Sequence, residues 1–194
     1  MNSLPKLPPS SPPLRLPKTQ NPQPPSKIRL LRAPAGMGKK AKDKQYWLLK
    51  TEPGEWSWED QAANGGATKW DGVRNRQAQN NLKAMSLDDL CFFYHSGQKS
   101  RRIVGVVTVT REWYQDAEVG GGAVDVRAVG EMRRPVELEE LKRDEGLRKG
   151  GFQLLKQPRL SVVPVLPEVW ERICEMGGGY EGDGREVSRD GEAE

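Results

Sequence analysis

The 194-residue sequence predicts an α+β fold built around a strongly bent sheet or small barrel of five or six strands with interspersed short helices. Three observations indicate this class: apolar runs with the residue types of strands recur along the chain, the helical segments between them are short, and their spacing is uneven. A doubly wound sheet would instead require strands and helices in regular alternation.

Five segments carry strand signals. Aromatic, aliphatic and β-branched residues are concentrated in short runs, or alternate with polar residues so that one face is buried and the other is wet. The alternation is clearest where Val124 and Val126 flank Asp125. The expected strands cover residues 46–51, 89–95, 102–110, 123–129 and 160–165.

Four helices are expected between and after these strands. Ser57 and Asp60 have the spacing of a capping box, Pro167 is a favourable first helical residue, and apolar residues at helical spacing support the other helices. The helices are expected over 57–63, over 73–85 after a loop that contains Trp70, in a segment opened by Pro135 with Leu138 and Leu141 inward, and in a segment from Pro167 with Leu166, Val169, Trp170, Ile173 and Cys174 on its apolar face, ended by the glycines at 177–179.

Charge is divided unevenly along the chain. Residues 1–42 hold nine basic and no acidic residues, residues 43–164 have a net charge of +1, and residues 165–194 have a net charge of −6. The overall charge of +4 is therefore a property of the N-terminal arm, and it does not by itself indicate a nucleic-acid-binding domain. If the folded part binds nucleic acid, a specific pocket must carry the binding.

The chain is expected to divide into an arm, one folded domain and a tail. Residues 1–44 form a basic arm that holds ten of the fifteen prolines, a composition that favours disorder with polyproline character. The arm is either an organellar transit peptide or an upstream extension of a chain whose natural start is Met37. Residues 45–178 form the folded domain, and residues 179–194 form an acidic, disordered tail.

Composition excludes several classes of protein. No apolar run approaches the roughly 18 residues of a membrane helix, so no membrane partner is expected. Cys91 and Cys174 cannot form a disulfide framework, and with His95, the one histidine, they cannot complete a four-ligand zinc site. No metal and no cofactor is expected.

The densest group of unusual residues lies between positions 47 and 81. Four of the six tryptophans fall between 47 and 70, and Trp70 either plugs the mouth of the barrel or offers a flat face for stacking. Two basic residues, Arg74 and Arg76, accompany a group of carboxamides, which either suit the edge of a nucleobase or form a merely solvated face. These carboxamides are Asn75, Gln77, Gln79, Asn80 and Asn81.

The strand end at 94–96 is a second candidate site. Tyr94, His95 and Ser96 lie where the predicted strand reaches the sheet edge. Because neighbouring residues on a strand point to opposite faces, His95 and Ser96 are poorly placed to act as base and nucleophile. Glu52, at the end of the first strand, is expected to be buried and paired with Lys50 or Arg74.

Separated motifs of the chain resemble the EVE domain family. They are YWLLKTEP at 46–53, WDGVRN at 70–75, QAQNNL at 77–82, FFYHS at 92–96, and QPRLSVVPV at 157–165 running on to EVWERICEMGG at 168–178. The resemblance spans about 45–178 and implies a PUA-like barrel related to the SRA and YTH readers. It implies a non-catalytic reader that binds a modified nucleobase, a modified cytosine in DNA, flipped into an aromatic-lined pocket.

The resemblance also implies site residues. Those implied to bind the base are Lys50, Thr51, Glu52, Trp70, Asp71, Gly72, Val73, Arg74, Asn75, Tyr94, His95 and Ser96, and those implied to bind phosphate are Arg76 and Arg159. The chain departs from the family where Arg76 replaces an aromatic residue, where Gln79 replaces an arginine, and in a shorter loop after Trp113.

Two other functions stay open. One is an RNA-binding module of the PUA or YTH type, and the other is a nucleotide-processing hydrolase that uses Glu52, Tyr94 and His95. The expected partner is DNA with modified bases, or RNA in the first alternative, and a monomer is expected. The expected location is the nucleus, or an organelle if the arm is a transit peptide.

Overall fold

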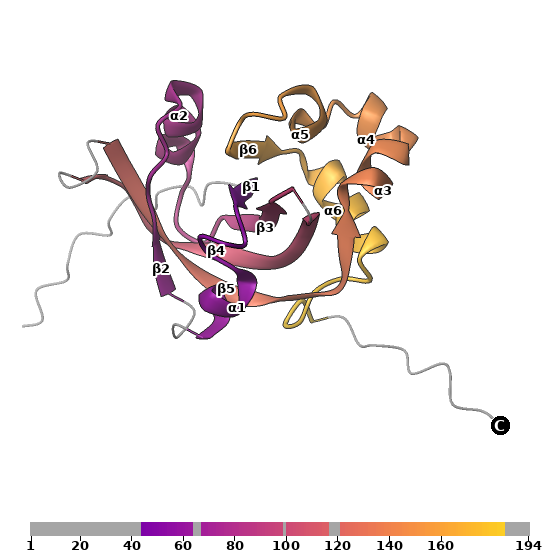
Figure 1. The fold of residues 1–194 in the computed structure, drawn as a ribbon, viewed down its shortest axis with the longest axis horizontal. Helices are drawn as coiled ribbons and strands as arrows, with labels where there is room; N and C mark the ends of the chain where they lie inside the picture. The colour runs from indigo at the N-terminus through magenta and orange to yellow at the C-terminus, as the bar shows by residue number, and fades with distance from the viewer. Residues whose placement is uncertain (1–43, 64–66, 99, 117–120, 185–194) are drawn as a thin grey trace, which may run out of the picture. The chain divides into compact units, whose positions relative to one another are not determined.

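The computed structural model describes residues 44–63, 67–98, 100–116 and 121–184; the rest of the expected arm and the last residues of the expected tail lie outside them. In this part the chain forms one mixed six-stranded sheet with short helices, which confirms the α+β class (Figure 1). The strands are β1 (Tyr46–Thr51), β2 (Ala67–Trp70), β3 (Leu90–Ser96), β4 (Arg101–Asp116), β5 (Gly121–Glu137) and β6 (Val162–Val165). The helices are α1 (Trp58–Ala63), α2 (Arg76–Ala84), α3 (Leu138–Arg143), α4 (Glu145–Lys149), α5 (Gln153–Lys156) and α6 (Pro167–Met176).

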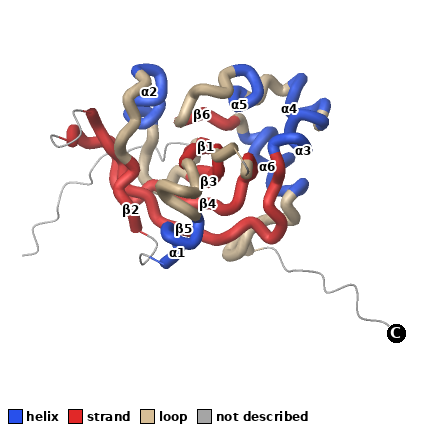
Figure 2. The backbone as a smooth tube through the Cα atoms, in the orientation of Figure 1, coloured by secondary structure: helices blue, strands red, loops and turns tan. Residues whose placement is uncertain are grey.

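The sheet is strongly bent because two of its strands are long and irregular. Its order is β2-β5-β4-β3-β1-β6; β1 runs parallel to β3, and the other neighbouring strands are antiparallel. The β4–β5 ladder shifts register at four places, and each irregularity bends and twists the strands locally. Strand β5 consequently runs in a broad curve beneath β1 and β3, from β2 to α3 (Figure 2).

Helix α2 ties together the two sides of the bent sheet. Strands β2 and β6 are the edge strands of the sheet. At one side, the Nδ2 group of Asn81 donates to the Val162 carbonyl oxygen in β6 at 2.7 Å. At the other, the Nε2 group of Gln79 donates to the Gly122 carbonyl oxygen in β5, beside β2, at 2.9 Å. The helix therefore bridges the seam that remains between the edges of the incomplete barrel.

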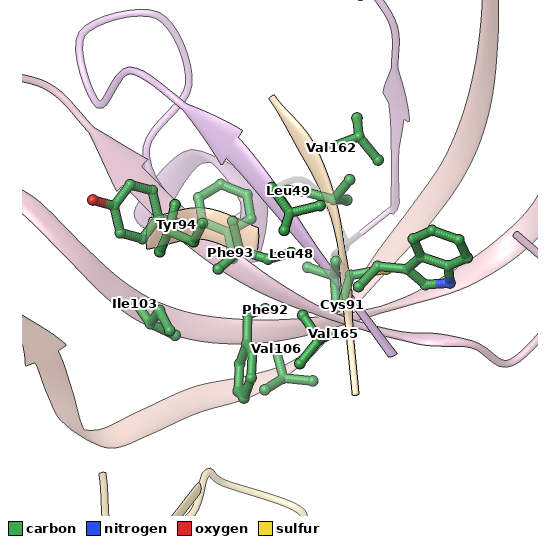
Figure 3. Packing of buried hydrophobic residues seen from close by; sticks show 14 of the residues in the cluster. Leu48, Leu49, Cys91, Phe92, Phe93, Tyr94, Ile103, Val106, Val162 and Val165 are labelled. Carbon is green, nitrogen blue, oxygen red and sulfur yellow. The ribbon is translucent and has the colours of Figure 1, made fainter. Parts of the chain in front are cut away.

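Buried hydrophobic side chains of β1, β3, β4 and β6 pack together in the core (Figure 3). The ring of Phe93 packs edge-on against Trp58 and Trp70, with centroid distances of 5.4 and 5.7 Å. A side chain is not tolerated at Gly105, because a Cβ atom there would lie 2.4 Å from the Trp58 ring. The glycine thus lets Trp58 of α1 pack directly against β4.

A buried carboxylate sets the start of β1 against the chain that enters β3. Asp89 is 2% exposed. It accepts hydrogen bonds from the Trp47 indole Nε1 at 2.9 Å, from the Gln45 backbone N at 3.0 Å and from the Ser86 backbone N at 2.9 Å. These bonds hold the parallel pair in register and compensate the carboxylate for lost hydration.

The first half of the chain shows two differences from the expected elements. Trp70 ends the short strand β2 instead of lying in a loop, because residues 67–70 pair with β5. Helix α2 begins at Arg76 instead of residue 73, because Asn75 has extended backbone angles and its Oδ1 caps the helix by accepting from Ala78 N at 3.0 Å. The capping box of Ser57 and the helix over 58–63 are confirmed.

The second half differs in three places. Pro135 lies inside β5 and does not open a helix; among the described strands only β4 pairs with that part of β5, so the missing N–H breaks no second ladder. The short helices α4 and α5 carry too few residues for a periodic signal. Leu166 precedes α6 as its N-cap and is 56% exposed, so it does not belong to the apolar face.

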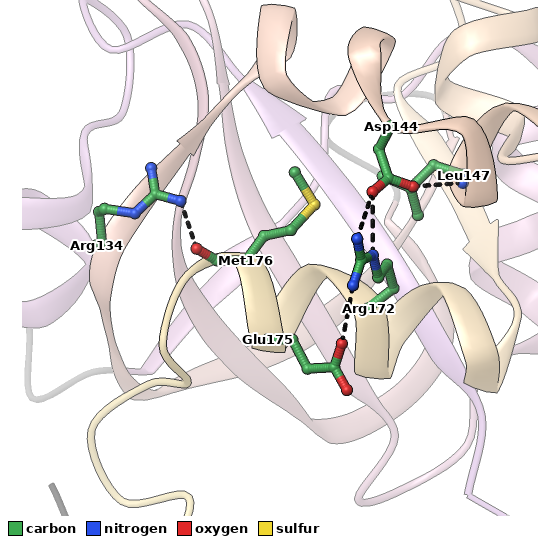
Figure 4. A network of polar contacts seen from close by, with 6 residues as sticks. All are labelled: Arg134, Asp144, Leu147, Arg172, Glu175 and Met176. Atoms are coloured by element: carbon green, nitrogen blue, oxygen red, sulfur yellow. Dashed lines mark hydrogen bonds and ion pairs between the residues drawn. The ribbon is translucent and has the colours of Figure 1, made fainter. Parts of the chain in front are cut away.

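The four C-terminal helices lie together (Figure 1), and an ion pair joins the start of α4 to α6 (Figure 4). The carboxylate of Asp144 caps α4 by accepting from Leu147 N at 2.9 Å and accepts from the Arg172 guanidinium of α6 at 2.9 and 3.0 Å. The Leu147 bond, helped by Arg172, holds the pKa of Asp144 below its ordinary value. Arg134 of β5 donates to Met176 O, which connects the last helix to the sheet.

The chain after α6 folds back along β5. Met132 forms a bridge with Tyr180, and the Arg133 guanidinium donates to both carboxylate oxygens of Asp183 at 2.7 and 2.9 Å. Residues 179–184, assigned from the sequence to the tail, are therefore part of the folded structure.

Gln79→Ala tests the bridging role of α2. The substitution removes two hydrogen bonds donated by Nε2 and one accepted by Oε1 from Trp113 Nε1. Each such bond contributes about 0.5–1.5 kcal/mol, so the free energy of unfolding should fall by about 2–3 kcal/mol. Asn80→Ala, at an exposed position of the same helix, is the control and should change it by less than about 0.5 kcal/mol. Equal denaturation curves for the two variants would contradict the role.

Candidate functional site

A pocket of about 470 Å³ opens where the sheet does not close. Its walls come from the end of β1, from β2 with the loop that follows, and from the residue before β6, so it lies between the two edge strands. Its volume falls within the range of roughly 300–1,000 Å³ typical of small-molecule sites. The lining residues are Lys50, Thr51, Glu55, Trp56, Thr68, Lys69, Trp70, Asp71, Gly72, Val73, Arg74 and Ser161.

Two tryptophans form the aromatic part of the pocket wall, and they are held differently. Trp70 is 7% exposed and packs on Phe93, so most of its ring belongs to the core. Trp56 is half-buried, and its indole Nε1 donates to Oε1 of the fully buried Gln61 at 3.0 Å. The Thr51 hydroxyl also donates to the Trp56 carbonyl oxygen at 3.2 Å. The orientation of the more accessible ring is therefore set by hydrogen bonds.

The polar groups of the pocket combine cations with hydroxyls and with the carboxylates of Glu55 and Asp71. Lys69 Nζ contacts Asp116 at 2.7 Å and Asp71 at 3.1 Å, and the bond to Asp116 is the main reason why the Lys69 pKa is raised. Arg74 is exposed at the rim. The Thr68 hydroxyl oxygen is buried and has no hydrogen bond partner among the described residues.

Lys50 lies at the end of β1, between the pocket and the segment before β6. Its Nζ donates to the Pro158 carbonyl oxygen at 2.8 Å and lies 5.9 Å from the centroid of the Tyr94 ring. Burial lowers the pKa of Lys50 to about 8. Lys50 is therefore mostly protonated at neutral pH, but less completely than an ordinary lysine.

The structure brings together seven of the twelve residues proposed for base binding and leaves five outside this pocket. The seven are Lys50, Thr51, Trp70, Asp71, Gly72, Val73 and Arg74. Glu52 is exposed and not buried as expected. Arg76 is exposed at the start of α2, and Arg159 lines a different pocket together with Asn75.

The three residues at the end of β3 belong mostly to the structure beneath the pocket. Tyr94 is 3% exposed, and burial raises its pKa to about 12. His95 is 5% exposed and packs edge-on against Phe93, and burial lowers its pKa. Its Nε2 atom has no hydrogen bond partner among the described residues. Ser96 donates from its hydroxyl to the Thr51 carbonyl oxygen at 3.1 Å.

The carboxamides of α2 divide into structural and accessible groups. Asn75 caps the helix, while Gln79 and Asn81 bridge the seam, so their polar atoms serve the fold. Gln77 and Asn80 are exposed. The base-reading interpretation of the whole group is therefore too broad.

Five pocket residues were not singled out from the sequence: Glu55, Trp56, Thr68, Lys69 and Ser161. Trp56 had a signal, since it belongs to the group of four tryptophans between 47 and 70. Thr68 and Lys69 lie on the strand that was not predicted, and Ser161 reaches the pocket only through long-range packing.

Two kinds of feature are absent from the described part of the chain. No three or more His, Cys, Asp or Glu side chains in this part of the chain are grouped as ligands for a metal ion. No helix among residues 44–184, the undescribed gaps aside, has the length and hydropathy needed to cross a membrane.

Comparisons with known proteins agree on one family. The model of the EVE domain matches residues 45–176. Thymocyte nuclear protein 1 of Mus musculus is 36% identical over 164 residues, which cover 68% of this chain and 73% of that protein.

Solved structures match over most of their own length. Protein Atu2648 from Agrobacterium tumefaciens is 41% identical, with a TM-score of 0.65 over 70% of this chain and 94% of that one. Human THYN1 protein, crystallised in complex with 5-methylcytosine containing DNA, is 30% identical, with a TM-score of 0.64 over 69% of this chain and 98% of that one.

Lys50 should leave a signature in the pH dependence of stability. Its pKa is about 8 in the folded protein against an ordinary value of 10.5, so between these values the unfolded chain binds more protons. The free energy of unfolding therefore gains a contribution that rises with pH across this window, and Lys50→Met removes it. Denaturation between pH 8 and 10.5 should show wild type gaining stability relative to the variant. A constant difference would contradict the burial of the ammonium group.

Proposed function

The chain belongs to the EVE domain family, and from that premise we propose that it is a non-catalytic reader that binds a modified cytosine of DNA in the pocket between β2 and β6. The complex of human THYN1 with 5-methylcytosine containing DNA supports this ligand. The observation that carries the proposal is the pocket itself, which joins aromatic walls to hydroxyl and cationic groups in one place.

Each part of the pocket suits a flipped base. An extruded base needs a flat apolar surface to replace the stacking lost in the duplex, and Trp56 with the accessible edge of Trp70 offers one. The base edge needs donors and acceptors. The Thr68 hydroxyl, which has no hydrogen bond partner among the described residues, is a group of this kind in the pocket wall. Lys50 and Arg74 are placed at the walls, where they suit the phosphates on either side of the flipped nucleotide.

The geometry of β3 favours binding over catalysis. A serine nucleophile needs a base within hydrogen-bonding reach, whereas the Ser96 hydroxyl donates to the Thr51 carbonyl oxygen. The His95 ring is buried against Phe93, burial lowers its pKa, and its Nε2 atom makes no hydrogen bond to a hydroxyl group among the described residues. We therefore propose that the protein binds the base without catalysing a reaction.

The nucleus is the proposed location, supported by the name of the relative thymocyte nuclear protein 1. Targeting to an organelle by residues 1–44 is the alternative. A fluorescent protein carrying residues 1–44 tests the alternative: delivery to an organelle would overturn the nuclear assignment, and a diffuse distribution would remove the organellar alternative.

Titration with matched oligonucleotides tests the ligand. Duplexes that differ only in cytosine, 5-methylcytosine or 5-hydroxymethylcytosine at one position should bind with different affinities, because a modified base changes the contacts inside the pocket. Equal affinity for every version would overturn the proposal. Tighter binding by single-stranded RNA carrying a modified base would favour the RNA-binding alternative, and turnover lost in His95→Ala would favour the hydrolase.

Trp56 is a cleaner probe of stacking than Trp70. Trp70→Ala would remove a core ring and cost about 3–5 kcal/mol of stability, whereas Trp56 is half-buried. Base–aromatic stacking contributes about 1–3 kcal/mol, so Trp56→Ala should weaken binding of the modified duplex by roughly 5- to 150-fold. Trp56→Phe keeps a flat face and should retain most of the affinity. Equal losses in the two variants would argue against stacking.

A further inference from the structure

A second pocket, of about 380 Å³, adjoins the first. It is lined by Asn75, Gln77, Gln157, Pro158, Arg159 and Leu160. All of these except Leu160 are exposed, so the polar groups of the pocket are accessible.

The two pockets share a wall. Arg74 lines the first pocket and the next residue, Asn75, lines the second. On the other side, Leu160 lines the second pocket and Ser161 the first. Lys50 of the first pocket also donates to the Pro158 carbonyl oxygen of the second at 2.8 Å. Because consecutive Cα atoms are about 3.8 Å apart, the wall between the pockets is about one residue thick.

The lining of the second pocket suits a nucleotide. It contains the exposed carboxamides of Gln77 and Gln157 and the exposed guanidinium of Arg159, while Asn75, which also lines it, uses its Oδ1 to cap α2. None of the described residues that line it carries a carboxylate. Carboxamides present paired donors and acceptors to a base edge, and a guanidinium group matches the geometry of phosphate. The pocket on α4 has different chemistry, since Glu145 lines it beside Arg148 and Lys149.

We infer that the second pocket takes the nucleotide that adjoins the modified base, with its phosphate on the Arg159 guanidinium and its base edge against the carboxamides of Gln77 and Gln157. The inference rests on the proposed function, because the strand reaches the second pocket only if its modified base occupies the first. It makes the protein a reader of a dinucleotide step, so the identity of the neighbouring base affects affinity.

Single-stranded trinucleotides with a central 5-methylcytosine, flanked by adenine or by thymine on both sides, test the inference on the full chain. A carboxamide pairs best with adenine, so the adenine-flanked version should bind more tightly. Gln77→Ala combined with Gln157→Ala should abolish this difference. An affinity that ignores the flanking base in wild type, or a preference that survives the double substitution, would overturn the base contact.

Arg159→Gln tests the phosphate contact. Losing one phosphate contact to a single strand should reduce the slope of log affinity against log salt concentration by about 0.7. Arg143→Gln, the same change at an exposed position at the end of α3, should leave the slope unchanged. If the two arginine variants behave alike, the phosphate contact is overturned.

Trp56→Ala separates this inference from the proposed function. The same trinucleotides and their unmodified versions are titrated against both variants. If Trp56→Ala no longer distinguishes modified from unmodified cytosine while Arg159→Gln leaves the salt slope unchanged, the second pocket alone is overturned. If Arg159→Gln reduces the salt slope while Trp56→Ala still distinguishes modified from unmodified cytosine, the base pocket is overturned. The assignment of the second pocket to the neighbouring nucleotide is then overturned with it. Absence of binding by any trinucleotide, with the modified duplex still bound, overturns the second pocket alone, and absence of binding by both overturns both.

Discussion

The side-chain amides of α2 hold the incomplete barrel at the width that creates the pocket. If β2 and β6 paired directly, their backbone groups would close the seam and fill the space where the pocket lies. Instead, Gln79 and Asn81 bind the carbonyl oxygens of β5 and β6 from one helix. The helix therefore acts as a spacer that keeps β2 and β6 apart, and the pocket lies between these edge strands.

The pocket and the core are mechanically continuous through one aromatic ring. Phe93 contacts Trp58 of α1, Trp70 of the pocket wall and His95 of its own strand. Trp70 is 7% exposed and packs on Phe93, so its position is set by the close-packed core. Arg74 is exposed and therefore freer to adjust to a ligand than Trp56, whose indole is held by Gln61.

The strongest sequence predictions were those carried by local signals. The capping box at Ser57, the apolar face of α6 and the alternation around Asp125 each depend on residues a few positions apart, and the structure contains all three. Strand β2 was missed because its four residues are too few for a pattern, and its pairing partner lies more than fifty positions away. Because β2 was not predicted, Trp70, its last residue, was assigned to a loop.

By itself, the sequence determined the family, the α+β class and the segment that supplies most of the pocket, since motifs and periodicity are properties of neighbouring residues. Tertiary structure decided which members of that segment share a surface. In the tertiary structure Tyr94 and His95 are buried, and the amides of Gln79 and Asn81 bridge the seam. Ser161, from a distant part of the sequence, lines the pocket. The reason is physical: burial and hydrogen-bond partners depend on where the bent sheet brings distant residues together, which no local pattern records.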